Sequence, residues 1–319
     1  MHVLTTEIDQ LSLPAELAQS GAVLTVGSFD GIHLGHQKLI QQSIARARAL
    51  SYTAGLVTFA PHPAAVLDPD RAPQTLTSRQ IKLDLLRAKG LDLVAMILFT
   101  GKLRDTSPRD FVQALCDKLH MRELWVGPDF ALGRDRSGNL TALTTLEKPL
   151  GFTVHQVSYV TQEGRRISSS QIRALLAEGR VAEAAKLLGR FYSLRGRVVH
   201  GKKLGRTIGF PTANLQVCPD CLVPAHGVYA TTVTVDGVQY GAATNVGVRP
   251  SVDNGALSIE AYVLDYDQDL YDHEIELSFV RRLRPEMRFE NVQGLISQMR
   301  QDVVQTRRVL KTESRNDHV

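Results

Sequence analysis

The sequence predicts an α/β protein in two parts, an N-terminal doubly wound parallel sheet followed by a C-terminal β-barrel with a terminal helix. In the first half, short apolar runs alternate with helix-length amphipathic patterns. From residue 192 to about residue 283, β-rich runs are broken by glycine and proline, with no helix-length pattern among them. A chain of 319 residues can build two hydrophobic cores, so we expect two domains.

The elements of the first half follow from these patterns in order. Buried strands are expected over 22–26, 54–59, 93–98, 123–126 and 153–157, and helices over 37–50, 78–88 and 108–119. Such alternation favours a parallel sheet with right-handed crossovers. Gly27, Pro61 and Gly127 each follow a predicted strand, and ligands of such sheets bind beyond the carboxyl ends of the strands. We therefore expect the site at that edge.

The second half shows a different sequence pattern. Two short helices are expected over 169–176 and 181–188, and the change of period at 189–191 predicts domains of 1–188 and 189–319. Runs over 229–235, 242–246 and 257–264 predict barrel strands. Apolar residues recur at three-and-four spacing at Val292, Leu295, Ile296, Met299 and Val303. They predict an amphipathic helix packed on the barrel, with a partner-binding helix as the alternative.

Composition excludes some classes of protein. The net charge of +4 comes without a long basic block, so we expect phosphorylated small molecules rather than nucleic acid as ligands. Three cysteines do not make a disulfide framework, and Cys218-Pro-Asp-Cys221 reads as a loop, with metal or redox use as the alternative. Without a membrane-length apolar stretch or a leader-like N-terminus, we expect a cytoplasmic protein that does not enter the membrane.

The run from Gly27 to His36 carries the clearest chemistry. A strand that ends in glycine and opens a helix directs backbone N–H groups and a helix dipole at an anion. Gly27, Ser28 and Gly35 are expected to supply backbone contacts, while His33 and His36 donate to phosphate oxygens. The sequence therefore predicts a phosphate site between the first buried strand and the first long helix.

Other candidates in this half have plain structural alternatives. Hydroxyl and guanidinium donors gather at a helix start at Ser168, Ser169, Ser170 and Arg173, where ordinary N-capping is the alternative. Asp129 fits either a ligand contact or a turn. His62 is held between two prolines and fits either a turn or the side of a site.

In the barrel half, residues 196–203 almost spell a P-loop, but Lys203 stands where Mg²⁺ requires a Ser or Thr. We expect a different phosphate-facing loop, whose members are Gly201, Lys202, Gly205 and Arg206. An extended backbone places Thr212 and Asn214 on one face, where their oxygens suit Mg²⁺. Glu260 is the candidate general base, with a solvated strand glutamate as the alternative.

These motifs carry a resemblance to a known family. His33-Leu-Gly-His36 resembles the signature of nucleotidylyltransferases, and the blocks at 58–63, 126–133 and 167–173 resemble bacterial bifunctional riboflavin kinase/FMN adenylyltransferases, also called FAD synthetases. The blocks at 196–215, 227–230 and 269–271 are similar to the riboflavin kinase module of that family. The resemblance spans most of the chain, in family order.

The resemblance implies two reactions. Riboflavin and ATP would give FMN in the C-terminal domain, and FMN and ATP would give FAD and pyrophosphate in the N-terminal nucleotidylyltransferase domain, both with Mg²⁺. The FMN phosphate is already an anion and needs no general base, whereas the riboflavin hydroxyl does. Ser168, Ser169, Ser170 and Arg173 would hold the β- and γ-phosphates, and Asp129 would contact the nucleotide or flavin. Flavin contacts are implied for Phe59, His62, Asp129 and Arg249.

The chain also departs from the family pattern. The departures are Ala131, Ser251, Tyr262 and Asp272, where the family often has Arg, Thr, His and Gly. Most of them lie in the kinase half. We therefore keep two alternatives, an adenylyltransferase with a silent kinase half and a non-catalytic flavin- or nucleotide-binding regulator.

Overall fold

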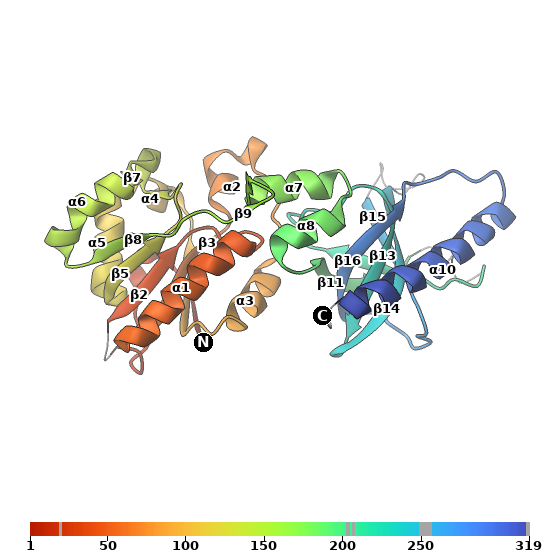
Figure 1. The fold of residues 1–319 in the computed structure, drawn as a ribbon, viewed down its shortest axis with the longest axis horizontal. Coiled ribbons are helices and arrows are strands. Elements are labelled where there is room, and N and C mark those ends of the chain that lie inside the picture. The colour runs from red at the N-terminus through yellow and green to blue at the C-terminus, as the bar shows by residue number, and fades with distance from the viewer. Residues whose placement is uncertain (19–20, 202–204, 206–207, 249–256, 317–319) are drawn as a thin grey trace. The chain divides into compact units, whose positions relative to one another are not determined.

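The computed structural model describes residues 1–18, 21–201, 205, 208–248 and 257–316 (Figure 1). The chain forms two compact units. Met1–Thr75 and Arg79–Ser168 make up the first unit, and Leu76–Ser78 and Ser169–Val319 the second.

The first unit is built on a six-stranded parallel sheet with the order β1-β4-β3-β2-β5-β8. Its strands are β1 (His2–Thr6), β2 (Ala22–Val26), β3 (Thr53–Ala60), β4 (Leu93–Leu98), β5 (Met121–Val126) and β8 (Thr153–Gln156). From β2 the chain runs outward through β3 and β4 and then returns to β5 on the other side of β2. The order of strands therefore reverses between β2 and β5, which is where open sheets of this kind bind ligands.

Helices cover both faces of this sheet. The longer ones are α1 (Leu34–Leu50), α3 (Arg79–Arg87), α5 (Pro108–Leu119) and α6 (Leu140–Leu150), and the short ones are α2 (Pro63–Leu67) and α4 (Gly101–Arg104). Along β2, Val23 belongs to the core beneath α1, whereas Leu24 belongs to the core beneath α5 and α6. This alternation gives the strand two buried faces, as expected of a doubly wound sheet.

The predicted strands and helices of this unit are all present, together with elements that were not predicted. Two of these are β1, which pairs with β4, and α6, whose last turn contains Pro149. The short strands β6 (Ala131–Leu132) and β7 (Gly138–Asn139) pair with each other, as do β9 (Thr161–Gln162) and β10 (Arg165–Arg166).

The second unit contains a closed barrel with the order β11-β12-β15-β14-β13-β16. Its strands are β11 (Tyr192–Val199), β12 (Ala213–Val217), β13 (Gly227–Val235), β14 (Val238–Val248), β15 (Leu257–Val263) and β16 (Glu274–Arg284). The rings of Tyr192, Tyr229 and Phe279 fill its interior. The centroid of the Phe279 ring lies 6.3 Å from that of Tyr192 and 5.2 Å from that of Tyr229. The barrel is thus a packed core of its own.

Three helices accompany the barrel. The terminal helix α10 (Val292–Asn316) packs on β13, β14 and β16, as the spacing of its apolar residues predicts. Helices α7 (Ser169–Ala177) and α8 (Val181–Leu188) pack on each other, and α8 also packs on β16 and β11. Because of these contacts the second compact unit begins at Ser169, whereas the predicted functional boundary lies at 188/189.

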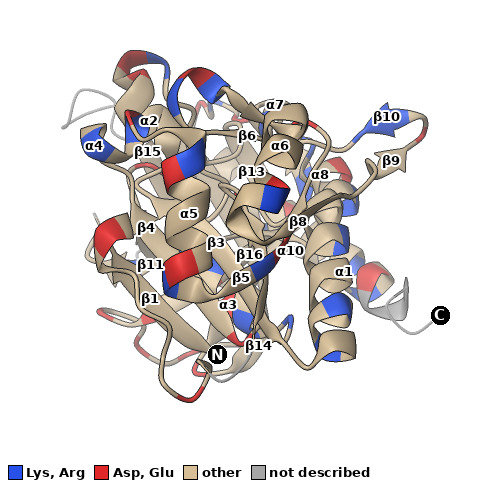
Figure 2. Ribbon diagram, turned by 90° about the vertical axis from the view of Figure 1, so that its left-hand side faces the viewer, with Lys and Arg blue, Asp and Glu red and all other residues tan. Residues whose placement is uncertain are grey.

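Two of the helices that cover the sheet differ in the sign of their charged residues. Helix α5 carries both signs, whereas α1 carries Lys38, Arg46 and Arg48 and no acidic residue (Figure 2). These basic side chains are engaged by Ser158, Glu123 and Asp92 respectively. No described helix has both the length and the apolar character needed to cross a bilayer.

Candidate active sites

The loop between β2 and α1 brings the two motif histidines together at the switch point of the sheet. Its backbone has positive φ at Phe29 (45°), Gly31 (80°) and Ile32 (41°), a conformation that costs energy for a β-branched residue. Phe29 and Ile32 are buried, and this packing holds the loop in its strained form. Such strain concentrates at functional sites.

His33 both begins α1 and faces His36. Its Nδ1 accepts a hydrogen bond from the backbone N–H of His36 at 3.3 Å, so in the neutral ring the proton lies on Nε2. The two imidazole rings stack with centroids 3.7 Å apart. The same side chain therefore caps the helix and stacks on His36.

His36 is held in its neutral form. Burial, followed by the positive charges of His33 and Lys82, places the pKa of His36 well below its usual value. Its Nδ1 has no hydrogen-bond partner among the described residues, and the Phe29 ring stands edge-on at 5.2 Å. A neutral imidazole can donate one N–H to an oxygen without transferring a proton.

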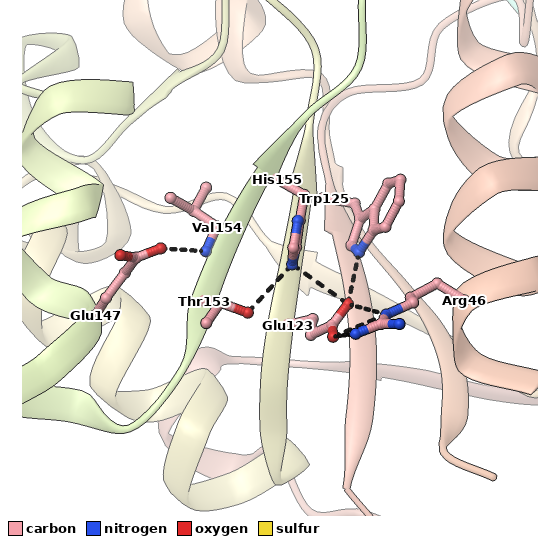
Figure 3. Close-up of polar contacts among 7 residues, drawn as sticks. All are labelled: Arg46, Glu123, Trp125, Glu147, Thr153, Val154 and His155. Atoms are coloured by element: carbon pink, nitrogen blue, oxygen red, sulfur yellow. Dashed lines mark hydrogen bonds and ion pairs between the residues drawn. The ribbon is translucent and has the colours of Figure 1, made fainter. Parts of the chain in front are cut away.

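Helix α1 is fastened to the sheet by a buried carboxylate (Figure 3). Glu123 of β5 accepts hydrogen bonds from Arg46 of α1 at 2.8 to 3.1 Å and from the Trp125 indole at 3.0 Å, and His155 Nε2 lies 3.4 Å away. Burial alone would raise the pKa of Glu123, but these bonds and the charges of His155 and Arg46 lower it below its usual value. The network fixes the helix that carries His36.

Asp129 lies after β5 in a turn closed by the Phe130 N–H and the Gly127 carbonyl oxygen at 3.2 Å, and its exposed side chain belongs to a polar cluster. It accepts from the Tyr159 hydroxyl and forms an ion pair with Arg166, whose guanidinium stands 4.6 Å from the Tyr159 ring centroid. Arg136 donates to the Asp129 carbonyl oxygen at 3.1 Å. A ligand at Asp129 would meet this basic and aromatic surface.

The two candidates at the end of β3 and just after it have structural contacts. Phe59 is half-buried and packs on the rings of Phe99 and Phe111 at 5.6 and 6.3 Å. His62 caps the short helix α2, with its Nδ1 accepting from the Ala64 N–H at 3.2 Å. The geometry thus provides the structural role that was considered for His62, and it leaves the flavin role of both residues as a prediction.

The serine cluster is divided between the two units. Ser168 is the last residue of the first unit, whereas Ser169, Ser170 and Arg173 belong to α7 of the second. Their proposed contact with nucleotide phosphates stays a prediction.

In the barrel, three polar side chains line up across neighbouring strands. Glu260 of β15 is in register with Asn214 of β12 on one side and with Asn245 of β14 on the other. Glu260 is half-buried and accepts from the Ser258 hydroxyl at 2.8 Å, while Asn214 is only 8% exposed. The opposite face of β15 carries the buried Ile259 and Ala261, so the predicted orientation of Glu260 is confirmed.

Glu260 and Asn245 of this row line a cavity of 310 Å³ between the barrel and α10, a size found for small-molecule sites. Thr212 and Glu260 line it together with aromatic and aliphatic side chains. These include Phe210, Tyr262, Met287, Phe289, Leu295 and Met299. The cavity therefore combines apolar walls with the Thr212 hydroxyl and four charged side chains, those of Glu260, Arg284, Glu286 and Asp302.

A second cavity of 460 Å³ borders the same strands. It is lined by the loop from Tyr266 to Tyr271 and by Pro211, Thr212 and Ala213. Thr212 lines both cavities, so the two spaces approach each other at its side chain.

Two glycines make close backbone approaches near the row of Asn214, Glu260 and Asn245. A Cβ on Gly201 would lie 2.3 Å from Asn214 Nδ2, and one on Gly205 would lie 2.2 Å from the Phe210 carbonyl oxygen. Only glycine fits at either position without displacing its neighbour. The other predicted members of this site, Lys202, Arg206 and Arg249, lie outside the described residues.

Comparison with known proteins finds a known family for each half of the chain. Residues 15–171 match the family model described as FAD synthetase, and residues 188–310 match the one described as riboflavin kinase. A bifunctional riboflavin kinase/FMN adenylyltransferase of Listeria monocytogenes is 36% identical over 308 residues, covering 96% of this chain and 95% of that protein. The enzyme of the same name from Pseudomonas fluorescens is 38% identical, with 90% and 92% covered.

The chain belongs to the bifunctional riboflavin kinase/FMN adenylyltransferase family. It phosphorylates riboflavin to FMN with ATP and adenylylates FMN to FAD with ATP, releasing pyrophosphate. Both domains are present, which supports the bifunctional activity over a silent kinase half or a regulator. A crystal structure from Streptococcus pneumoniae, described as a macrolide-efflux protein, is 28% identical with a TM-score of 0.87, covering 96% of this chain and 99% of that one.

The structure accommodates two of the departures from the family pattern. Asp272 replaces a usual glycine, and its φ of 65° explains the preference for glycine there. Aspartate tolerates this conformation, and Arg197 contacts its carboxylate at 3.2 Å. Tyr262 lies in the wall of the barrel cavity, edge-on to Phe210 at 5.2 Å. Ser251 lies outside the described residues, and Ala131 begins β6.

Sequence reasoning missed several residues of these sites. Lys82, whose ammonium contacts the loop before α1, looks like a surface residue of a helix, although it shares the buried side of α3 with Leu86. Asn245 carries no motif, but its pairing with Glu260 could be inferred once the strand register is known. The apolar wall from α10 was predicted only as packing.

Proposed function

We propose that adenylyl transfer takes place at the loop between β2 and α1. There His33 and His36 donate hydrogen bonds to the α-phosphate of ATP, and Gly27, Ser28 and Gly35 provide backbone contacts. The stacked imidazoles and the lowered pKa of His36 support this assignment, because the rings are fixed in place before the substrate arrives. The FMN phosphate attacks as an anion, so positioning and donors to the developing charge are sufficient.

We further propose that the kinase reaction takes place where the two barrel cavities meet. The observation that carries this proposal is that Thr212 lines both cavities. Phosphoryl transfer needs the acceptor hydroxyl and the donor phosphate at one point. Riboflavin would fill the apolar cavity, ATP would enter from the other, and Glu260 would accept the proton of the riboflavin hydroxyl.

The polar side chains next to Glu260 suit a hard cation. Thr212 and Asn214 would hold Mg²⁺ through hydroxyl and amide oxygens, and the missing Cβ at Gly201 leaves room for the amide of Asn214. The ion would neutralise charge on the phosphates of ATP. Mg²⁺ is likewise proposed for FAD formation.

The remaining assignments are part of the same proposal. Nucleotide phosphates would be held by Ser168, Ser169, Ser170 and Arg173 in one reaction and by Gly201, Lys202, Gly205 and Arg206 in the other. Phe59, His62, Asp129 and Arg249 would contact flavin. The functional domains would be 1–188 and 189–319, and the enzyme would work in the cytoplasm, where ATP is available.

Chromatography of flavins after incubation with riboflavin or FMN, ATP and Mg²⁺ tests the two sites separately. His33→Ala is expected to abolish FAD formation and to spare FMN formation. Glu260→Gln is expected to abolish FMN formation from riboflavin and to spare FAD formation from supplied FMN. Equal loss of both products in both variants would contradict the two-site assignment.

A further inference from the structure

Lys82 is the one buried lysine among the residues that the structure describes. It lies on α3 and is only 8% exposed, although lysine is almost never buried without a partner. Burial lowers the pKa of Lys82, and the charge of the buried Asp30 partly offsets this effect. A buried ammonium costs free energy, so its contacts deserve a functional explanation.

The main contact of Lys82 is a single carbonyl group in the loop between β2 and α1. Lys82 Nζ donates to the Ser28 carbonyl oxygen at 2.8 Å, and Thr58 Oγ1 donates to the same oxygen at 3.1 Å. A carbonyl oxygen has two lone pairs, so these two donors use both. The Ser28 carbonyl is thereby held from α3 and from β3 at once.

This contact also sets the direction of the next N–H group. In a trans peptide the carbonyl and the following N–H point in opposite directions. Because the Ser28 carbonyl points at Lys82, the N–H of Phe29 points away from it. That N–H makes no hydrogen bond to another described residue, and it lies next to the strained part of the loop.

The ammonium also acts on His36 through its charge. Lys82 is one of the causes that keep the pKa of His36 low, after burial and His33. The titratable and charged groups around this imidazole are therefore His33, Lys82 and, in the same loop, the buried Asp30. Loss of the Lys82 charge would move the pKa of His36 upward.

We propose that Lys82 is a positioning residue for FMN adenylylation, which orients the Ser28–Phe29 peptide toward the anion and places a positive charge beside His36. The proposal rests on the assignment of adenylyl transfer to this loop. Lys82 acts through the loop and the imidazole.

The test compares variants of the full chain. Lys82→Met removes the charge and the donor while keeping an apolar chain of similar length, and Lys82→Arg keeps the charge. Lys89→Met is the matched control, because Lys89 also bonds α1 from the end of the same segment, but through Gln37 Oε1 at 3.0 Å. Rates of FAD formation from FMN and of FMN formation from riboflavin are measured from pH 5 to 9, with kcat and KM separated.

Lys82→Met is expected to lower kcat for FAD formation by about 10- to 100-fold, less than the roughly 100- to 1000-fold lost with a direct donor, because Lys82 acts through the loop. The acid limb of its kcat/KM profile should move to higher pH, because His36 loses a charge that disfavours its protonation. Lys82→Arg should keep the acid limb of the parent enzyme, and Lys89→Met should keep rate and profile. FMN formation should be unchanged in all three variants.

Two results would overturn the role of Lys82. One is an unchanged kcat and acid limb in Lys82→Met. The other is an equal loss of both activities with a lowered melting temperature, which would make the residue merely structural. A failure of the site assignment itself is recognised separately, because His33→Ala would then retain FAD formation.

Discussion

A buried ion pair joins the terminal helix to the barrel beside the cavity of 310 Å³. Asp302 of α10 is 3% exposed and accepts hydrogen bonds from Arg284 Nε at 2.9 Å, Arg284 Nη2 at 2.7 Å and Gln298 Nε2 at 3.0 Å. Both charged residues line the cavity assigned to riboflavin. We expect Asp302→Leu to destabilise the barrel unit and to weaken riboflavin binding.

The expected loss of stability depends on the Arg284 charge, which is left without its partner. Removing one partner of a buried pair costs about 3–5 kcal/mol when the other charge has no replacement. The Arg284 side chain is 15% exposed and still donates to the Pro285 carbonyl oxygen at 3.1 Å, so we expect about 2–3 kcal/mol. The double variant Arg284→Met with Asp302→Leu leaves no unpaired charge and should lie within about 1.5 kcal/mol of the parent.

Native-state hydrogen exchange of the barrel strands in urea measures this free energy for the barrel unit alone. Glu313→Gln is the matched control, because Glu313 pairs with Arg281 between the same helix and strand but in a more exposed place. It should change stability by less than about 1 kcal/mol. The KM for riboflavin should rise in Asp302→Leu, since Leu295 and Met299 of α10 line the cavity. Equal costs for Asp302→Leu and Glu313→Gln, or no recovery in the double variant, would refute the reasoning.

Three further changes test other parts of the structure. Glu123→Gln should lower the free energy of unfolding by about 1–2 kcal/mol at pH 7; because the folded pKa of Glu123 is lowered, the difference should vanish as pH falls below about 4 in acid titrations monitored by circular dichroism. Gly201→Ala should reduce FMN formation more than about tenfold, since its Cβ would displace Asn214, and an unchanged rate in a riboflavin kinase assay would contradict this. Phe210→Ala should raise the riboflavin KM about tenfold through lost ring contact with ligand, while FAD formation from FMN, measured in parallel, should stay the same.

Sequence patterns were sufficient where chemistry is local. The stretch around Gly27 to His36 predicted a buried strand followed by a loop and a helix, as found, whereas its role as a phosphate site stays a prediction. Alternation along 257–263 placed Glu260 on the face opposite Ile259, as found. Both inferences need only the period of a single element.

The sequence was insufficient where a role depends on distant pairing. Lys82 contacts the loop between β2 and α1 only because α3 shares a buried core with β2 and β3, and a lysine in a helix is ordinarily exposed. Likewise, β1 is a strand because it pairs with β4, far along the chain. The attachment of α8 to β16 and β11 is also invisible to local periodicity.

The wall that α10 gives to the barrel cavity has a consequence for biosynthesis of the enzyme. Domains generally fold during translation in the order in which they leave the ribosome. The loop from Gly27 to His36 and its sheet are complete long before Leu295 and Met299 have been added. On a nascent chain, the site that we assign to FAD formation can therefore form first, and the site that we assign to the preceding reaction, FMN formation, is finished last.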